Sequence, residues 1–506
     1  MKKFSTYFLY SLGVLILFAL IFNMGYLIFW PYLTSDFQKD FPDNTAIIQG
    51  KINSLPIFKP HHQIQFDFKT ISPNIGVLAC HWYGLYPQLT PGDLWVLKLK
   101  LKSWQTIQKL QNLKNKNLQN QDFNYASYLI SHQYSGTCVV LNNFNNHKIY
   151  LKKLFYLADL ADLTDLNFLR SHLRNMLWHQ IYNLDGRATM MALVLGDRSG
   201  ITQDQWSVLR NTGTNHLIAI AGLHIALVTL IGFFLAWNFF IRSKKICELG
   251  WIPNLSLIFS WLVGFIYSAM AGFSIPTQRA LIMLTVFIFG KLLGLKFNSY
   301  FSWVLAAVLI ILINPWSVLD AGMWLSFTAV FFLIYGYQEY ALNQRDHFSK
   351  FKKIWHELFY PQWFIFIGLM PISLYCFGQF STIGLITNFI AIPYLFFMIL
   401  PLLLFSVFLT LILNFFSNSY FSNFSNFIIL ITHDLFLIIN FLILCLWKFL
   451  GFFSDLPYSH ILIRTPPLIL VILSTLGAMI LLTPRLGIKR LLGLILLLSV
   501  FLSDFL

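Results

Sequence analysis

The stretch Asn211–Leu230, NTGTNHLIAIAGLHIALVTL, is the start of a predicted membrane-spanning helix that carries two histidines, His216 and His224. An imidazole in hydrocarbon needs a polar partner or contact with water, so a histidine inside a membrane span marks a candidate functional site. The whole composition agrees with a membrane location, because 57% of the 506 residues are hydrophobic and only 11% are charged. We therefore expect a polytopic α-helical membrane protein.

Further apolar runs follow this stretch, and each approaches the length that crosses a bilayer. The runs lie at about 214–241, 251–272, 277–295, 298–313, 321–337, 359–378, 384–416, 427–450, 465–483 and 488–505. The run at 384–416 is long enough for two crossings, and Pro393 and Pro401 provide positions at which its helix could break. The sequence thus predicts a multi-span domain over residues 214–506.

The N-terminal part has a different pattern. Residues 1–35 begin with MKK and continue as an apolar run without a small-residue cleavage pattern, which predicts a retained membrane anchor. Residues 36–155 alternate between apolar and polar side chains, as strands with one wet face do. In residues 91–102, PGDLWVLKLKLK, the apolar residues point one way and the lysines the other: Trp95, Leu97, Leu99 and Leu101 against Lys98, Lys100 and Lys102.

Several more short strands are predicted in the same region, among them TAIIQGKI, QIQFDFKT, NIGVLAC and YSGTCVVL. Together they give about five strands, a number compatible with a small barrel such as an OB-fold. Periodicity does not distinguish this barrel from a β sandwich. Residues 156–213 follow with mixed charge and are expected to form amphipathic or interfacial helices.

Basic residues between the apolar runs indicate the orientation, and they explain the net charge of +15 before nucleic acid binding needs to be considered. The clusters at 242–245, 291–296 and 345–353 fall on one side if every span crosses once. The connectors GFSIP, NPWSVLD and GQFST on the other side contain no Lys or Arg. That side is therefore expected to be extracytoplasmic, together with the strand-rich domain. After residue 384 the scheme accommodates the last basic residues only if one segment is re-entrant or doubled: Arg485, Lys489 and Arg490.

The five cysteines divide between the two parts of the chain. Cys80 and Cys138 lie in the strand domain, and two thiols in an oxidising compartment are candidates for a disulfide. The alternative is that both are small buried hydrophobic residues in separate strands. Cys247, Cys376 and Cys445 lie in or beside spans and are most simply packing residues.

The block Ala192–Val228, ALVLGDRSGITQDQWSVLRNTGTNHLIAIAGLHIALV, closely resembles the signature of the ComEC family of DNA-uptake channels. Gly272–Met283, Asn314–Val330 and Thr387–Leu402 resemble membrane segments of that family in the same order. Phe123–Thr137 is similar to the segment that closes its extracytoplasmic OB-like domain. The resemblance covers nearly the whole chain.

This resemblance implies a channel in the bacterial inner membrane that passes single-stranded DNA into the cytoplasm during natural transformation. It implies the bilayer and single-stranded DNA as partners, with a periplasmic DNA receptor and a cytoplasmic motor or single-strand-binding proteins. Many members also carry a C-terminal metallo-β-lactamase-like domain, whose metal site needs closely spaced histidines. The thirteen histidines of this chain contain no H-x-H pair. We therefore expect no cofactor, no metal and no hydrolytic site, with degradation of the other strand left to a separate nuclease.

The two histidines can be placed on a helix that runs continuously from Thr214. Three- and four-residue spacing puts His216 in one stripe with small residues, Ala219, Gly222 and Ala226, and leaves His224 to its side. Small residues leave room for a DNA strand, or they let another helix approach closely. The resemblance favours His216 or His224 lining or shaping the path.

Arginines near the outer face are further candidates for the DNA path. Arg279, three residues after Pro276, is placed to contact phosphate or to pair with Asp320. Three more arginines are expected either to form a basic mouth or to pair with aspartates close by in sequence: Arg187, Arg198 and Arg210 with Asp185, Asp197 and Asp204.

The strand domain offers a surface for a polyanion. Lys98 and Lys100 share one strand face, although an ordinary solvated face is the simpler interpretation. His81, Trp82 and Tyr83 are candidates for stacking on bases, or for the barrel core.

Two other classes of protein remain possible from the sequence. A membrane enzyme of the polysaccharide polymerase or ligase type would need an outer pair of polar residues, for which His216 with Asp320 is the candidate. A small-solute transporter would be expected to show paired broken helices in two similar halves, which the sequence does not display.

Overall fold

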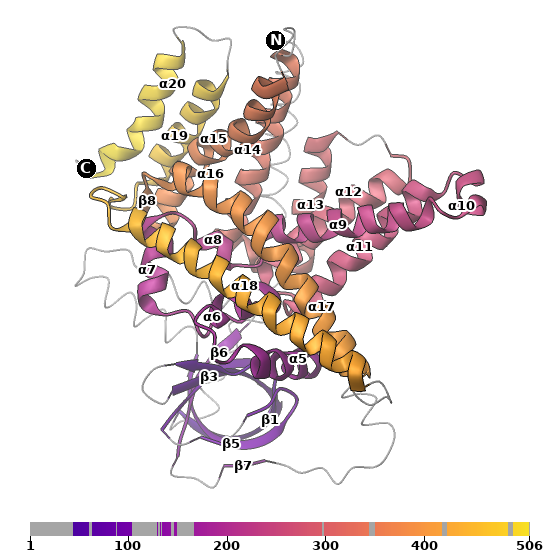
Figure 1. The fold of residues 1–506 in the computed structure, drawn as a ribbon. Helices are drawn as coiled ribbons and strands as arrows, with labels where there is room; N and C mark the ends of the chain where they lie inside the picture. Colours follow the sequence, from indigo (N-terminus) through magenta and orange to yellow (C-terminus); the bar gives the residue numbers. More distant parts are fainter. Residues whose placement is uncertain are drawn as a thin grey trace.

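The computed structural model of the chain describes residues 44–59, 63–84, 86–87, 89–103, 129, 132, 134–142, 146–148, 166–295, 298–343, 350–416, 422–483 and 489–504. The expected N-terminal anchor at 1–35 lies outside these residues, as does most of Phe123–Thr137. Figure 1 shows a small β barrel at one end of the molecule and a larger helical domain next to it.

The barrel is built from five main strands with two short additions. The strands are β1 (Thr45–Ile52), β2 (Ile57–Lys59), β3 (Gln63–Ser72), β4 (Val77–Tyr83), β5 (Leu94–Ser103), β6 (Tyr134–Val140) and β7 (His147–Lys148). The order is β1-β3-β4-β6-β5, and a β1–β5 pairing closes it. Only β4 and β6 run parallel among these five strands. Closure excludes the sandwich and gives the Greek-key barrel typical of an OB-fold.

The barrel interior follows from the period-two pattern. The apolar side chains of β5 are buried in it, and Phe66 and Phe68 of β3 pack beside them. Lys100 and Lys102 point outward and are exposed, while Lys98 is half-buried. Gly50 is required where β1 crosses β3, because a Cβ there would lie 2.5 Å from the Lys69 carbonyl oxygen.

Cys80 and Cys138 lie directly opposite each other on the parallel strands β4 and β6. The structure joins them in a disulfide, with Cα atoms 4.5 Å apart. Both side chains belong to the barrel core. The bond therefore ties together two strands that are 58 residues apart in the chain.

Four helices lead from the barrel into the membrane domain: α5 (Leu166–Ile181), α6 (Arg187–Leu195), α7 (Gln203–Asn211) and α8 (Asn215–Ile218). Helix α5 lies next to the barrel, and Arg174 Nη1 donates a hydrogen bond of 3.2 Å to the Pro56 carbonyl oxygen. Helix α6 differs from the interfacial helix that the sequence suggested. Its residues Thr189–Leu195 are buried at the centre of the largest apolar core, against the later helices α17 and α18.

The membrane domain consists of long apolar helices. They are α9 (Gly222–Phe240), α11 (Ile252–Met270), α12 (Ile275–Leu292), α13 (Ser299–Ile313), α14 (Ala321–Asn343), α15 (Lys350–Phe377), α16 (Gly384–Tyr394), α17 (Leu400–Phe416), α18 (Ser422–Ser454), α19 (Leu468–Leu482) and α20 (Lys489–Leu498). Shorter pieces are α10 (Lys244–Glu248), β8 (Gln379–Ser381), β9 (His460–Leu462), and the turns η2 (Pro315–Leu319), η3 (Leu395–Ile399) and η4 (Ser499–Asp504). Within the described part of the chain, six helical segments are long and apolar enough to cross a bilayer. The protein is therefore a polytopic helical membrane protein with a small N-terminal barrel.

Two expectations about the spans are wrong. The run 214–241 is not one helix, because α8 ends at Ile218 and extended backbone at Ala219 and Ala221 precedes α9. The run 384–416 does not break, because a π-helical turn, η3, joins α16 to α17. In that turn the Leu400 N–H bonds to the Leu395 carbonyl oxygen, and the wider turn accommodates Pro401, which has no N–H to donate.

Two of the connectors that lack basic residues, GFSIP and GQFST, lie near the ends of α6 and α7. Arg170 Nε donates to the Met270 carbonyl oxygen at the end of α11, and Ser381 Oγ donates to the Asn211 carbonyl oxygen at the end of α7. Helix α18 follows α17 and packs along it (Figure 1). The end of α18 therefore lies on the same side of the membrane domain as the start of α16. With one helical path over 384–416, the basic residues 485–490 fall with the earlier basic clusters. No doubled segment is needed after residue 384, contrary to expectation.

Candidate functional site

The segment between α7 and α9, Thr212–Ala221, is the centre of the candidate site; we refer to it as the broken segment. Buried hydroxyl groups hold its first residues. Thr212 Oγ1 and Thr214 Oγ1 are 2.8 Å apart, and Thr387 Oγ1 of α16 donates to the Thr212 carbonyl oxygen over 2.8 Å. Gly213 has a φ of 67°, and a Cβ at this position would lie 3.0 Å from the Ser381 side chain. The polar NTGT motif therefore serves as a joint that fixes the broken segment against α16.

His216 lies on α8 within the broken segment. Its side chain is solvent-accessible, although the surrounding protein desolvates the ring and lowers its pKa from 6.5 to about 4. Desolvation disfavours the charged form of an imidazole. His216 is therefore neutral at physiological pH.

His224 lies in the first turn of α9 and is only 1% exposed. Its Nδ1 accepts the Ala221 N–H over 3.4 Å, which places the proton of a neutral ring on Nε2. The Nε2 atom is buried without a hydrogen-bond partner. The ring also contacts Phe396 of η3, with centroids 5.2 Å apart. His224 thus joins the start of α9 to the π-helical turn.

The expected stripe of His216, Ala219, Gly222 and Ala226 on one helix is wrong. The chain leaves the helical conformation between Ile218 and Gly222, so the two histidines lie on separate helices. They nevertheless lie near each other at the two ends of the break. The sequence identified both residues but not the geometry that brings them together.

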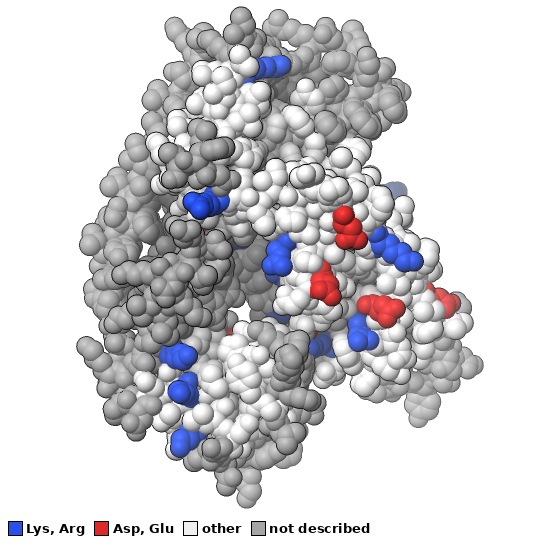
Figure 2. Space-filling view, turned by 90° about the vertical axis from the view of Figure 1, so that its left-hand side faces the viewer, with Lys and Arg blue, Asp and Glu red and all other residues white. Residues whose placement is uncertain are grey.

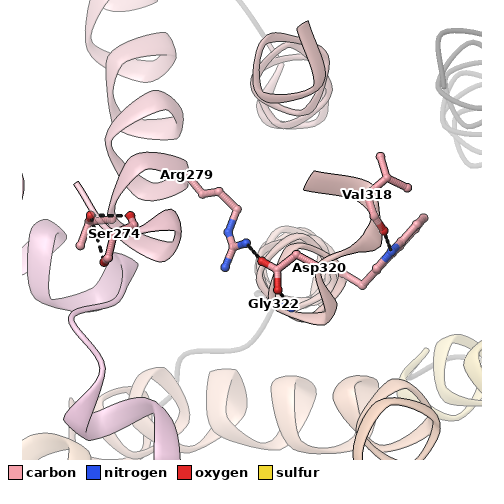
Figure 3. A network of polar contacts seen from close by, with 7 residues as sticks. Ser274, Arg279, Val318, Asp320 and Gly322 are labelled. Atoms are coloured by element: carbon pink, nitrogen blue, oxygen red, sulfur yellow. Dashed lines mark hydrogen bonds and ion pairs between the residues drawn. The ribbon is translucent and has the colours of Figure 1, made fainter. Parts of the chain in front are cut away.

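Arg279 and Asp320 form a buried ion pair between α12 and the residue before α14 (Figure 3). The Arg279 side chain is 4% exposed, and its Nη1 lies 2.5 Å from Asp320 Oδ2. Asp320 Oδ1 also accepts the Gly322 N–H over 3.1 Å. Of the two roles considered for Arg279, the geometry favours pairing with Asp320. The ion pair with Arg279 also engages the Asp320 carboxylate, which the alternative enzyme site of His216 with Asp320 would need.

The ion pair is a neighbour of the broken segment. A Cβ on Gly222 would meet Ala280 Cβ at 3.5 Å, so the first turns of α9 and α12 are in contact. Arg279 precedes Ala280 in the chain, and its Nε is buried without a hydrogen-bond partner. The start of α9, the start of α12 and Asp320 therefore form one polar region inside an apolar domain.

The other three arginines are distributed over the approach to this region. The Arg187 guanidinium lies 5.7 Å from the centre of the Trp178 ring and donates to the Tyr182 carbonyl oxygen. Arg198 is half-buried and has interaction partners, whereas Arg210 is exposed at the end of α7. The structure supports local contacts for Arg187 rather than a common basic mouth.

Two arginines that the sequence did not single out have a clear structural role. Arg170 Nη2 donates to the Leu195 carbonyl oxygen over 2.8 Å, and burial lowers its pKa against the opposing effect of Asp197. Arg174 Nη2 pairs with Asp197 Oδ2 at 3.0 Å while its Nη1 bonds to the barrel. The sequence pattern that could have identified them is their four-residue spacing, which places Arg170 and Arg174 on one face of α5. They connect the LGDRSG turn, the α11 end and the barrel.

The barrel surface presents its own candidates. Figure 2 shows Lys or Arg side chains, without Asp or Glu beside them, along one edge of the lower part of the molecule, where Figure 1 places the barrel. His81 and Tyr83 stack on the outer face of β4 with centroids 6.4 Å apart, and Gln63 contacts His81. Trp82 is a core residue instead, since it is buried and bonds to Asn142.

Among the described residues, no group of three or more His, Cys, Asp or Glu side chains is arranged to hold a metal ion. The arrangement offers hydrogen-bond donors and an ion pair within an apolar domain.

Comparisons with known proteins place the site within a domain that matches a family model. The model of a family described as Competence protein matches residues 193–486, more than half of the chain. Over 243 residues the chain is 32% identical to Recombination protein 2 of Haemophilus influenzae, a match covering 47% of this chain and 30% of that protein. It is 32% identical to Competence protein ComA of Neisseria gonorrhoeae over 30% of this chain and 21% of ComA.

A third relative is ComE operon protein 3 of Bacillus subtilis, with 28% identity over 43% of this chain and 26% of that protein. The matched part thus spans less than a third of the length of each of these relatives. No solved structure matches the chain.

Proposed function

Because the chain belongs to the Competence protein family, we propose that it is a channel that carries single-stranded DNA across the inner membrane during natural transformation. One relative is named a competence protein and another a recombination protein, and both names suit a protein that handles incoming DNA. The resemblance noted in Ala192–Val228 lies largely inside the matched family domain.

The observation that carries this proposal is the broken segment. Non-helical backbone within a membrane domain is tolerated where it is buried in protein or lines a water-filled cavity. Here the break lies between α8 and α9, beside His216, His224 and the Arg279–Asp320 pair. A polyanion needs such polar groups at intervals to pass through an apolar domain.

The barrel is proposed to be extracytoplasmic. Connectors without Lys or Arg meet on the side of α6 to α8, where Arg174 also attaches the barrel, whereas the exposed α10 with Lys244 and Lys245 lies at the far end of α9 (Figure 1). Lys and Arg are retained on the cytoplasmic side. The Cys80–Cys138 disulfide also suits an oxidising compartment.

The proposed partners follow from this orientation. A barrel outside the membrane, with exposed Lys100 and Lys102 and the His81–Tyr83 stack, is suited to receive DNA from a periplasmic receptor. On the inside, a motor or single-strand-binding proteins would draw the strand inward. We propose no catalysis by this chain and assign degradation of the other strand to a separate nuclease.

Uptake of labelled DNA, scored separately outside and inside the inner membrane, tests the proposal. Cells without the protein are expected to capture DNA but to contain no cytoplasmic strand. His216→Leu and His224→Leu should reduce import at normal protein abundance, while His172→Leu, at an exposed position on α5, is the matched control. Unchanged cytoplasmic DNA in the deletion would contradict the channel. A change in surface glycan instead would favour the polymerase or ligase alternative.

A further inference from the structure

The connector between α9 and α11 presents cations on the surface of the protein. Arg242, Lys244 and Lys245 are all exposed, and the connector 241–251 contains one acidic residue, Glu248. Within the described part of the chain, none of the three cations forms an ion pair. The connector therefore carries a net positive charge that the described protein does not neutralise.

Exposed apolar side chains lie among these cations. Leu249 is 64% exposed and Trp251 57%, and Ile241, directly after α9, is exposed as well. A group of exposed large apolar residues marks a surface that something else covers. Basic residues next to an exposed tryptophan are typical of a segment at the interface between a bilayer and water. The connector thus combines a surface for headgroups with a surface for acyl chains.

The two helices that the connector joins place it at the edge of the membrane. Both α9 and α11 are long and apolar enough to cross a bilayer, and they pack against each other. Phe240 ends α9 and Ile252 begins α11, so only the short helix α10 and its flanking turns lie between them. Figure 1 shows α10 at the tip of this helix pair, away from the barrel. The cations are therefore within reach of the lipid phosphates around α9 and α11.

The end of α12 adds a cation to the same edge. A short turn joins α11 to α12, and α12 packs on both α9 and α11, so its last residues lie at the end where α10 lies. Lys291 is exposed there, with its Nζ 4.9 Å from the centre of the Phe287 ring. Leu293 is exposed beside it. The combination of exposed cation and exposed apolar groups therefore recurs on a second element.

Two kinds of polyanion can neutralise this surface, a bilayer with anionic lipids and a DNA strand. A DNA strand would pair with the cations but leave Ile241 and Leu249 in water, because its bases stack on aromatic rings and not on aliphatic groups. A phospholipid layer covers the aliphatic side chains and brings phosphates to the cations at the same time. We propose that the connector 241–251, together with Lys291, binds the headgroups of anionic phospholipids. The proposal does not depend on DNA transport.

A fluorophore on Cys247, within the connector, tests the proposal in the full-length protein. Serine replaces Cys376 and Cys445 and the Cys80–Cys138 disulfide is kept, so the label reacts with the exposed Cys247. The labelled protein is placed in phosphatidylcholine bilayers with a nitroxide-bearing quencher lipid, either phosphatidylglycerol or phosphatidylcholine, at equal mole fraction. The anionic quencher should associate about five-fold more tightly, and added salt should reduce the difference.

Variants of the connector test whether its charges cause the preference. Lys244→Gln/Lys245→Gln should bring the two quenchers close to equal effect. The matched control Lys244→Arg/Lys245→Arg keeps both charges and should retain the preference.

A second label position tests whether the preference is local. Ile313→Cys, in a protein with Cys247→Ser, is as exposed as Leu249 and is followed by a connector without Lys or Arg. A label there should show no preference for the anionic lipid. Equal quenching by both lipids at Cys247, or the same preference at Ile313→Cys, would overturn the proposal.

Added oligothymidylate distinguishes the bilayer from a DNA strand as the partner. The proposal expects no change of fluorescence at Cys247 and no loss of quenching by the anionic lipid. If the oligonucleotide changes the fluorescence in phosphatidylcholine bilayers and prevents quenching by phosphatidylglycerol, the connector is a DNA surface and the lipid proposal is wrong.

Discussion

Two apolar runs of the membrane domain, 214–241 and 384–416, have different backbones. The first contains no proline and is interrupted between Ile218 and Gly222. The second contains Pro393 and Pro401 and continues as one helical path through a π-helical turn. The two runs touch each other where Phe396 contacts His224, and Thr387 bonds to Thr212 just before the first run.

The difference shows that contacts with neighbouring elements decide where a membrane helix breaks. The first run is anchored at its start by buried hydroxyl groups, so its polar residues are satisfied by side chains and not by a continuous helix. The second run is embedded in the main apolar core with α6 and α18, where a continuous helix satisfies its backbone without outside partners. The run with polar contacts at its start is interrupted, and the run packed in the apolar core is a continuous helix.

The largest expected effect comes from removing the ion pair next to the break. Arg279→Leu leaves Asp320 as a half-buried carboxylate without its cation, which should destabilise the fold by about 3 kcal/mol. We expect low abundance and a lower melting temperature for the detergent-solubilised protein. The double variant Arg279→Leu/Asp320→Leu removes both charges and should regain much of the stability.

The double variant also decides the role of Arg279. If the pair is structural, abundance and DNA import should recover together. Recovery of abundance without import would show that the guanidinium contacts the transported strand, contrary to the assignment made from Figure 3.

A smaller effect is expected from removing the hydrogen bond between Thr387 and the Thr212 carbonyl oxygen. Thr387→Val removes the donor to the Thr212 carbonyl oxygen and leaves that buried group less satisfied, at a cost of about 1–3 kcal/mol. Thr432→Val is the matched control, because Thr432 is also buried and bonds only to Ile429 in its own helix. Melting temperature and import should fall further for Thr387→Val. Equal losses would mean that the hydroxyl joint does not hold the break.

The continuous run can be tested in the opposite direction. Pro401→Ala supplies the missing N–H and should let η3 close into an ordinary α-helix. We expect stability to change by less than about 1 kcal/mol, since alanine favours the helix but loosens the unfolded chain. Thermal unfolding measures this change. A collapse of abundance would show that the π-helical turn itself, through Phe396 on His224, is needed by the fold.

The barrel was predictable because its strands alternate strictly. Trp95, Leu97, Leu99 and Leu101 are buried as their spacing predicted, and Cys80 and Cys138 meet in register. Closure was not predictable, because the β1–β5 pairing depends on strand order in space and not on the period of either strand.

The candidate site was predictable in residues and not in geometry. His216 and His224 stood out as imidazoles in an apolar run, but Ala219 and Ala221 are good helix formers and gave no sign of a break. The contact that holds the segment before the break comes from Thr387, which lies 175 residues from Thr212 in the chain. The role of Arg174 likewise depends on the docking of the barrel, which no local pattern encodes.

The smallest expected effect concerns the pH dependence of the broken segment. The pKa of His216 is lowered by desolvation from 6.5 to about 4, so between these values the native protein binds fewer protons than the unfolded chain. The stabilising contribution of the neutral ring is therefore complete above pH 6.5 and is lost as the pH falls towards 4. Asp67 in the barrel has a raised pKa because of burial and acts in the opposite direction, but it is present in all variants compared.

Acidification from about pH 7 to 5 should lower the melting temperature of the wild type by a few degrees more than that of His216→Gln. The variant His172→Gln, at an exposed position on α5, should follow the wild type. Identical pH profiles for the wild type and His216→Gln would mean that the His216 ring is hydrated as in the unfolded chain.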